Sequence, residues 1–95
     1  MGVLKPAEMR VFFIQMFTVY IIYSEKFDIY YIGQTGNLED RLQRHNQDRS
    51  KYTKRKGPWK LVWSREFPTR AEAMAFEKEL KRLKNRENLL KLIGE

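Results

Sequence analysis

Five side chains with the chemistry of a phosphodiester site are spread along the sequence. They are two phenols, a guanidinium, an imidazole and a carboxylate: Tyr20, Tyr31, Arg41, His45 and Glu77. A guanidinium matches phosphate oxygens with its planar fork of donors, a carboxylate holds a hard cation, and a phenol or an imidazole moves a proton. One carboxylate among so many other polar groups makes a poor salt-bridge network. The set is better suited to phosphodiester chemistry, provided that the fold brings it together.

Three aromatic and β-branched runs predict the strands that would carry the phenols. The first is residues 17–23, the second begins at Ile29 after the polar turn SEKFD, and the third is WKLVWSREF, residues 59–67. Alternate side chains of a strand point to opposite faces. Tyr30 and Tyr31 therefore lie on opposite faces, and the one that faces the interior needs a partner for its hydroxyl.

Polar caps followed by amphipathic stretches predict three helices. Asn37 is a candidate N-cap for a helix over about residues 38–48, and Thr69 with Glu72 has the pattern of a capping box that opens a helix to about Leu83. A short helix follows from near Glu87.

The predicted element order is ββαβαα, which indicates an α+β fold within the broad α/β class. We expect a small three-stranded sheet, mixed or antiparallel, flanked by about three helices. A chain of 95 residues is too short for two separate cores. We expect residues 1–16 to be an N-terminal extension and residues 17–95 to be a single domain.

Polar residues fall on the inward faces of two of these helices. In the first, Arg41 and His45 lie within about 60° of the apolar stripe that Leu38 and Leu42 define. The alternative is that Arg41 extends to the surface and that His45 is an ordinary, partly buried imidazole.

The long helix carries a carboxylate in a similar position. Glu77 lies between Met74 on one side and an apolar stripe on the other, formed by Ala73, Phe76, Leu80 and Leu83. An unpaired buried charge is costly, so this carboxylate must be paired or must ligate a cation. A salt bridge to Arg41 or to a lysine satisfies the same rule, and the sequence leaves both interpretations open.

The net charge of +7 is concentrated in one quarter of the chain. Residues 41–65 hold nine Lys or Arg and a single acid, Asp48, and so carry +8, whereas the remainder sums to −1. Such a basic block, with Tyr52, Trp59 and Trp63 among the charges, is typical of a face that binds a polyanion. A solvated loop is the alternative, and the tryptophans suit core positions as well as base stacking.

Composition excludes several other classes of protein. With 42% hydrophobic and 14% aromatic residues, the chain has enough apolar surface for a folded core, and without cysteine it has no disulfides or thiolate metal sites. The apolar run of residues 11–23 is interrupted, and it is shorter than the roughly 20 residues of a membrane-spanning helix. We expect a cytoplasmic protein with no membrane partner and no small-molecule cofactor.

The spacing of these residues resembles the GIY-YIG nuclease superfamily, and in particular its small stand-alone bacterial members. The first motif appears as TVY, residues 18–20, with Thr18 where glycine is usual, and the second as YIG, residues 31–33. GQTGNLEDRLQRHN is similar to the family's arginine-containing helix, and PWKLVW, FPTRAEAMAFEKELK and NLLKLI follow in the family's order. Asn85 is left out of the catalytic set, since the asparagine of some members has no secure counterpart here.

The resemblance implies a metal-dependent endonuclease that acts on nucleic acid, with DNA as the expected substrate. It implies that Glu77 holds one Mg²⁺ or Mn²⁺ ion and that Arg41 stabilises charge on the phosphorus. Tyr31 or Tyr20 would take the proton from the attacking water. His45 would orient a phenol or relay its proton.

Further residues are expected to hold nucleic acid without reading its sequence. Gly33 is expected to end its strand and let a phosphate approach the backbone, with a plain turn glycine as the alternative. Basic side chains are expected to contact neighbouring phosphates: Lys51, Lys54, Arg55, Lys56 and Lys60.

Two other functions are open on the sequence alone. One is a nucleic-acid-binding module that keeps the nuclease fold but cleaves little or nothing. The other is a protein-interaction domain whose basic loop binds an acidic partner. A single small domain also leaves room for a protein partner that supplies substrate selection.

Overall fold

The central strand is apolar on both faces, and this decides how the molecule is layered. The computed structural model describes residues 15–94, in which β1 (Phe17–Ser24) lies between β2 (Ile29–Thr35) and β3 (Lys60–Phe67). Both pairings are antiparallel, with Tyr20 opposite Gly33 on one side and opposite Ser64 on the other. The sheet is therefore purely antiparallel, and β2 and β3 are its edges.

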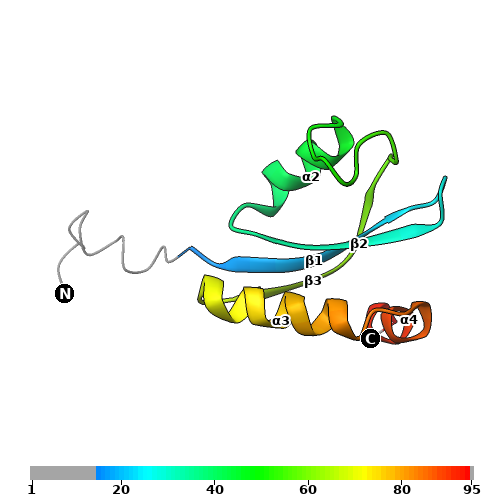
Figure 1. The fold of residues 1–95 in the computed structure, drawn as a ribbon. Coiled ribbons are helices and arrows are strands. Elements are labelled where there is room, and N and C mark those ends of the chain that lie inside the picture. Colours follow the sequence, from blue (N-terminus) through cyan, green and yellow to red (C-terminus); the bar gives the residue numbers. More distant parts are fainter. Residues whose placement is uncertain (1–14, 95) are drawn as a thin grey trace, which may run out of the picture.

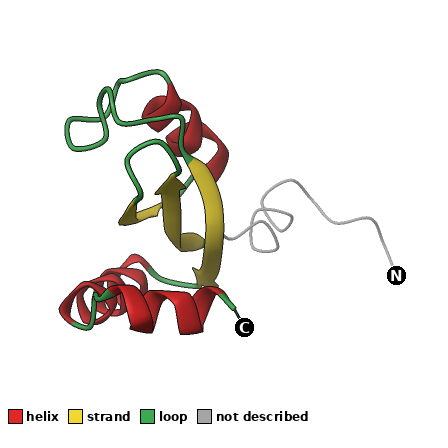
Figure 2. Cartoon of the chain, turned by 90° about the vertical axis from the view of Figure 1, so that its right-hand side faces the viewer, coloured by secondary structure: helices red, strands yellow, loops and turns green. Residues whose placement is uncertain are grey.

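Helices cover both faces of this sheet. α2 (Leu38–Asn46) lies on one face, and α3 (Arg70–Arg82) and α4 (Arg86–Ile93) lie on the other, as Figures 1 and 2 show. Val19 and Ile21 of β1 belong to the core under α3 and α4, whereas Tyr20 and Ile22 pack with Trp59 on the side of α2. The predicted class and the order ββαβαα are confirmed.

Side-chain caps begin each of the three helices found in residues 15–94. The side chains of Asn37 and Thr69 accept hydrogen bonds from the backbone N–H groups three residues later, as the sequence predicts. Asn85 caps α4 in the same way, which gives this asparagine a structural role.

Two predicted boundaries and one predicted core residue are wrong. The first helix ends at Asn46 rather than at about residue 48. α3 ends at Arg82, within one residue of the predicted end, but Leu83 of the predicted apolar stripe is 45% exposed and outside the core. β2 does not end at Gly33 but continues to Thr35, because the strand stays paired with β1 to that point. The expected N-terminal extension falls almost wholly on residues 1–14, which lie outside the described residues.

Candidate active site

Gly33 makes room for a phenol. The ring of Tyr20 lies across the backbone of β2, so that a Cβ built at Gly33 would stand 2.6 Å from the Cζ atom of Tyr20. Gly33 is buried in mid-strand, and its φ is not positive. The glycine is therefore required here by close packing and not by a turn.

A buried chain of hydrogen bonds starts at this phenol. The Tyr20 hydroxyl lies 2.8 Å from Nε2 of His45, and Nδ1 of His45 lies 2.6 Å from the hydroxyl of Thr53. All three side chains are almost completely buried. His45 thus orients Tyr20, whereas it contacts Tyr31 only through ring packing, with centroids 5.1 Å apart.

The electrostatics of this chain keep it neutral. Burial, followed by the positive charge of Arg41, lowers the pKa of His45 to about 4. Burial also raises the pKa of Tyr20 above its ordinary value, and the nearby Tyr31 and Glu77 add to this rise while Arg41 opposes it. At neutral pH the imidazole is uncharged, so one of its nitrogens donates to one hydroxyl and the other accepts from the second.

The two adjacent tyrosines of β2 have separate surroundings. Tyr30 packs against the core under α3 and α4, and its ring is 4.7 Å from that of Tyr23. Tyr31 is half-buried on the opposite face, beside Tyr20 and Trp59. It lines an open pocket of about 540 Å³ together with lysines that include Lys81.

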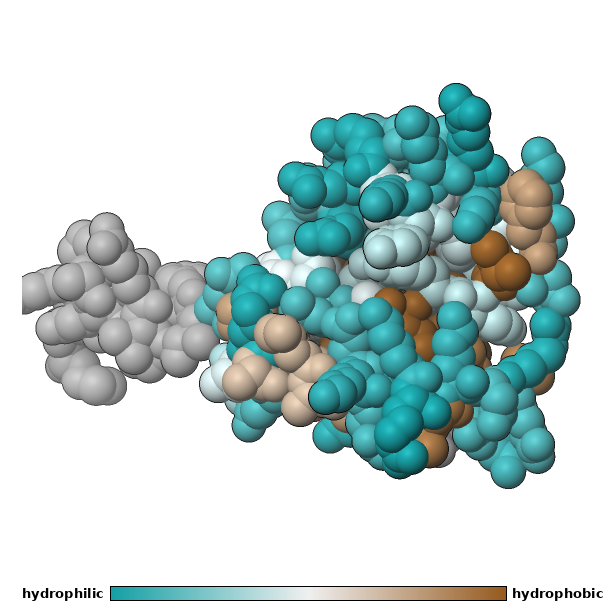
Figure 3. Space-filling view, viewed as in Figure 1, coloured by the Kyte–Doolittle hydropathy of each residue, from teal (hydrophilic) through white to brown (hydrophobic). Residues whose placement is uncertain are grey.

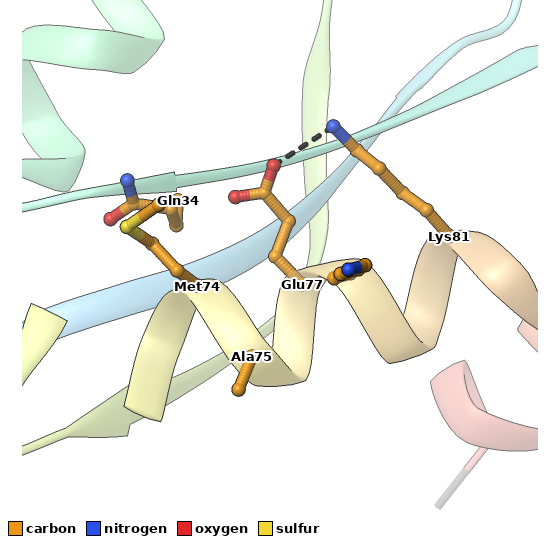
Figure 4. Close-up of a pocket in the computed structure, with 6 residues that line it drawn as sticks. Gln34, Met74, Ala75, Glu77 and Lys81 are labelled. Carbon is orange, nitrogen blue, oxygen red and sulfur yellow. Dashed lines mark ion pairs between the residues drawn. The ribbon is translucent and has the colours of Figure 1, made fainter. Parts of the chain in front are cut away.

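Glu77 reaches the same edge of the sheet from below. Its side chain is 20% exposed, and its Oε1 atom lies 2.8 Å from Nζ of Lys81. Figure 4 shows both side chains rising from α3 toward β2, while Ala75 points away. Glu77 and Lys81 line a second pocket of about 530 Å³, which Gln34 of β2 closes on one side. Of the two salt bridges considered from the sequence, the one to a lysine is present.

Lys81 connects the two halves of the site. It lines both pockets, so the Tyr31 pocket and the Glu77 pocket are neighbours, and both also touch the edge strand β2. Figure 3 shows brown and pale side chains in the band between α2 and α3, with teal side chains above and below. Candidate residues from both faces of the sheet thereby line two neighbouring pockets.

Arg41 stands on α2 with its side chain half-buried. Within residues 15–94, no carboxylate forms an ion pair with its guanidinium. Its charge acts on both Tyr20 and His45. Arg41 itself lines neither the Tyr31 pocket nor the Glu77 pocket.

The donor set suits a metal ion that keeps most of its own water. No group of three or more His, Asp or Glu residues gathers within the described part of the chain. Mg²⁺ is commonly bound through one or two carboxylates, with water and substrate phosphate oxygens completing its octahedral shell. The half-buried Glu77 carboxylate, open to a pocket, fits such a one-carboxylate site.

The basic loop, residues 49–58, is exposed at its charged tips but anchored inside. Four basic residues of this loop that the sequence analysis expects to contact phosphates are exposed: Lys51, Lys54, Arg55 and Lys56. Beneath them, Thr53 is buried, and its carbonyl accepts a hydrogen bond from the Trp59 indole at 3.1 Å. Trp59 is a core residue, whose backbone is held at both N–H and C=O by Asn46. Lys60 lies apart from this group, on β3, 3.9 Å from Glu25.

Sequence reasoning missed two residues of the site, Thr53 and Lys81. Lys81 follows Glu77 by four positions on a helix, a spacing that favours ion pairs and that was available as a signal. Thr53 lies within a run of charged residues and gives no comparable signal, because its burial depends on contacts with distant elements.

Comparisons with known proteins agree with this geometry. The model of the GIY-YIG catalytic domain matches residues 16–91. UPF0213 protein BH0048 of Halalkalibacterium halodurans is 38% identical over 68 residues, which are 68% of this chain and 72% of the relative. UPF0213 protein SH2523 of Staphylococcus haemolyticus is 40% identical over 78 residues, 81% of this chain and 93% of the relative.

A solved structure supports the same assignment. The solution NMR structure of UPF0213 protein BH0048 from Bacillus halodurans matches with a TM-score of 0.53 and 31% identity, over 83% of each chain. The sheet, its helices and the tyrosine motifs define a domain of the nuclease superfamily anticipated from the sequence. The chain belongs to the GIY-YIG family. None of the helices in residues 15–94 has the length and apolar character that a membrane span requires.

Proposed function

We propose that the protein is a metal-dependent endonuclease that hydrolyses phosphodiester bonds in DNA. One observation carries the proposal: the Tyr31 pocket and the Glu77 pocket are neighbours that share Lys81 beside the edge strand β2. A phosphodiester lying along this edge would meet a phenol, a carboxylate and several cations at once.

Tyr31 is the residue we assign to proton transfer. It is half-buried and lines a pocket, so a water molecule beside a bound phosphate can reach its hydroxyl. The lysines of that pocket supply the positive charge that a phenolate requires. Tyr20 is a positioning residue, because it is buried and its hydroxyl is engaged by His45.

Arg41 and Glu77 would handle the charge of the phosphate. Arg41 would donate to the phosphate oxygens as negative charge accumulates on them. Glu77 would hold one Mg²⁺ or Mn²⁺ ion, which when bound polarises the phosphate and stabilises the leaving oxygen. Lys81 would move from the carboxylate toward a neighbouring phosphate when the cation is present.

The test is cleavage of labelled nicked, branched, single-stranded and duplex DNA, and of RNA, with Mg²⁺, with Mn²⁺ or with EDTA. We expect metal-dependent cutting that Glu77→Gln abolishes while its thermal unfolding stays close to that of the wild type. Glu87→Gln is the matched control, because Glu87 pairs with Lys91 at the same spacing on α4. Undiminished cutting by Glu77→Gln would contradict the mechanism.

One observation favours a second function, a nucleic-acid-binding module with little cleavage. Glu77 is already paired with Lys81, and within residues 15–94 it belongs to no group of three or more potential metal-ligating side chains. Tight, salt-sensitive binding of DNA without cutting in any metal would support this alternative. If an acidic protein bound instead and excess DNA failed to displace it, the domain would be a protein-interaction module.

A further inference from the structure

The Tyr31 pocket contains more than proton transfer requires. Four aromatic residues and three lysines line an open space of about 540 Å³, together with Ile29: Tyr30, Tyr31, Tyr52, Trp59, Lys56, Lys81 and Lys84. Of the described residues that line it, none is acidic. The pocket therefore presents flat apolar surfaces within a positively charged rim.

The aromatic surfaces differ in how firmly they are held. Trp59 is buried, its indole N–H is bound to the Thr53 carbonyl, and its ring meets Tyr31 edge-on with centroids 6.5 Å apart. Tyr52 belongs to the basic loop and is 70% exposed. Trp59 thus lines the pocket as a fixed, buried ring, and the exposed ring of Tyr52 provides a surface on which a planar ring can stack.

Three lysines line the same pocket as these rings. Lys56 comes from the basic loop, and Lys81 and Lys84 come from the C-terminal end of α3 and the residues after it. Lys81 also lines the Glu77 pocket. A negatively charged group next to a ligand in this pocket would therefore be attracted to Lys81, the lysine that the two pockets share.

We propose that this pocket binds one unpaired nucleobase of the substrate strand, beside the phosphodiester to be cut. A base within a duplex hides both faces in the stack, so that only an unpaired or displaced base can stack on protein aromatic rings. The lysines would hold the phosphates on either side of the base. The substrate class is then DNA with unpaired nucleotides next to the cleavage position, in preference to continuous duplex.

This inference rests on the proposed function for the position of the cut, but its test is a binding experiment in EDTA. The probe is a DNA duplex with a short single-stranded overhang, carrying 2-aminopurine as its first unpaired nucleotide. The fluorescence of this base falls when it stacks on an aromatic ring. We expect quenching and tight binding with the overhang, and neither with a fully paired duplex that carries 2-aminopurine at the same position.

Variants locate the effect in the pocket. Tyr52→Ala should weaken binding of the overhang about tenfold, as expected for one lost stacking contact, and should abolish most of the quenching. Tyr52→Phe keeps the ring and should behave like the wild type. Phe27→Ala is the matched control, because Phe27 is also exposed and next to a lysine but does not line the pocket.

An overhang with an abasic site in place of the probe keeps the phosphates and removes the base. We expect it to bind about tenfold more weakly to the wild type and equally to Tyr52→Ala. Equal binding of the abasic and intact overhangs, or equal quenching by wild type and Tyr52→Ala, would overturn the proposal. So would full displacement of the DNA by polyglutamate at matched charge.

The same overhang made of RNA shows which nucleic acid the pocket accepts, and stronger quenching with RNA would overturn the assignment to DNA.

Cleavage of the same DNAs with Mg²⁺ separates the two proposals. Quenching without any cutting would support the base-binding pocket and contradict the endonuclease activity. Cutting of the overhang and the continuous duplex at equal rates would support the endonuclease activity and contradict the base-binding pocket.

Discussion

The hydroxyl of Tyr20 lies 2.8 Å from Nε2 of His45, in a region of the protein that water does not reach. His45 is held there in its neutral form, with a pKa of about 4 compared with an ordinary value of 6.5. The folded state consequently binds fewer protons than the unfolded state between these two values. The contribution of this histidine to stability is complete above pH 6.5 and is lost as the pH falls toward 4.

This linkage gives the first prediction. On lowering the pH from 7.5 to 5, the free energy of unfolding should fall by about 2 kcal/mol through His45 alone. Urea denaturation at both pH values measures the change. His45 is the single histidine of the chain, so His45→Gln should remove most of this dependence. A variant with the same pH dependence as the wild type would show that His45 is not the group responsible.

The second prediction concerns Gly33. Gly33→Ala should destabilise the fold by about 1–3 kcal/mol, because the new methyl group would overlap the ring of Tyr20. That ring cannot move aside easily, since it is buried and its hydroxyl is bound to His45. Thermal and urea unfolding measure the effect.

Gly36→Ala serves as the control for this substitution. A methyl group there would overlap only the end of the exposed Gln15 side chain, which can turn away at the cost of one exposed hydrogen bond to the Gly36 carbonyl. Equal stability of the two alanine variants would contradict the packing account of Gly33.

A third prediction follows from the ion pair between Lys81 and Glu77. Replacing Lys81 with methionine should raise the affinity for Mn²⁺ several-fold, because the carboxylate no longer shares its charge with an ammonium 2.8 Å away. The electron paramagnetic resonance signal of free Mn²⁺, recorded without DNA, measures how much of the ion is bound. Lys91→Met removes the equivalent exposed pair on α4 and should leave Mn²⁺ binding unchanged. Loss of affinity in Lys81→Met would mean that the lysine supports the metal site.

The basic loop leads to a fourth prediction. The logarithm of the DNA-binding constant falls linearly with the logarithm of the salt concentration. Each loop lysine that contacts a phosphate should contribute about 0.7–0.9 to the steepness of this slope. Lys51→Ala with Lys54→Ala should therefore lower that slope by about 1.5. Fluorescence anisotropy of labelled DNA at several salt concentrations measures it, with Lys91→Met as the control. An unchanged slope would place the DNA elsewhere on the surface.

The sequence was sufficient for the sheet, the helices and most of the site. Periodicity and caps predicted every element of residues 15–94, because β1 is strongly apolar and Asn37 and Thr69 mark helix starts. The inward positions of His45 and Glu77 followed from helical spacing alone. These features depend on residues that are close together in the sequence, so the spacing of residue types along the chain is enough to predict them.

Features that depend on contacts between distant elements were not predictable in the same way. The role of Gly33 depends on the pairing of β2 with β1, which brings the ring of Tyr20 over it. Our proposal that Tyr31 rather than Tyr20 transfers the proton rests on the burial of Tyr20, which follows from the packing of α2 and the basic loop. Leu83 matches the apolar stripe but lies just beyond the end of the helix, where no neighbour covers it.

The anchoring of the basic loop has a thermodynamic consequence. Basic segments that fold only on meeting nucleic acid lose conformational entropy at that moment, and this loss reduces their affinity. Here Thr53, Trp59 and Asn46 already fix the loop from beneath, through bonds that do not involve its charged tips. Binding through this loop is therefore expected to have only a small entropic penalty and a small change in heat capacity. The loop behaves as a rigid charged surface, in contrast to a basic tail.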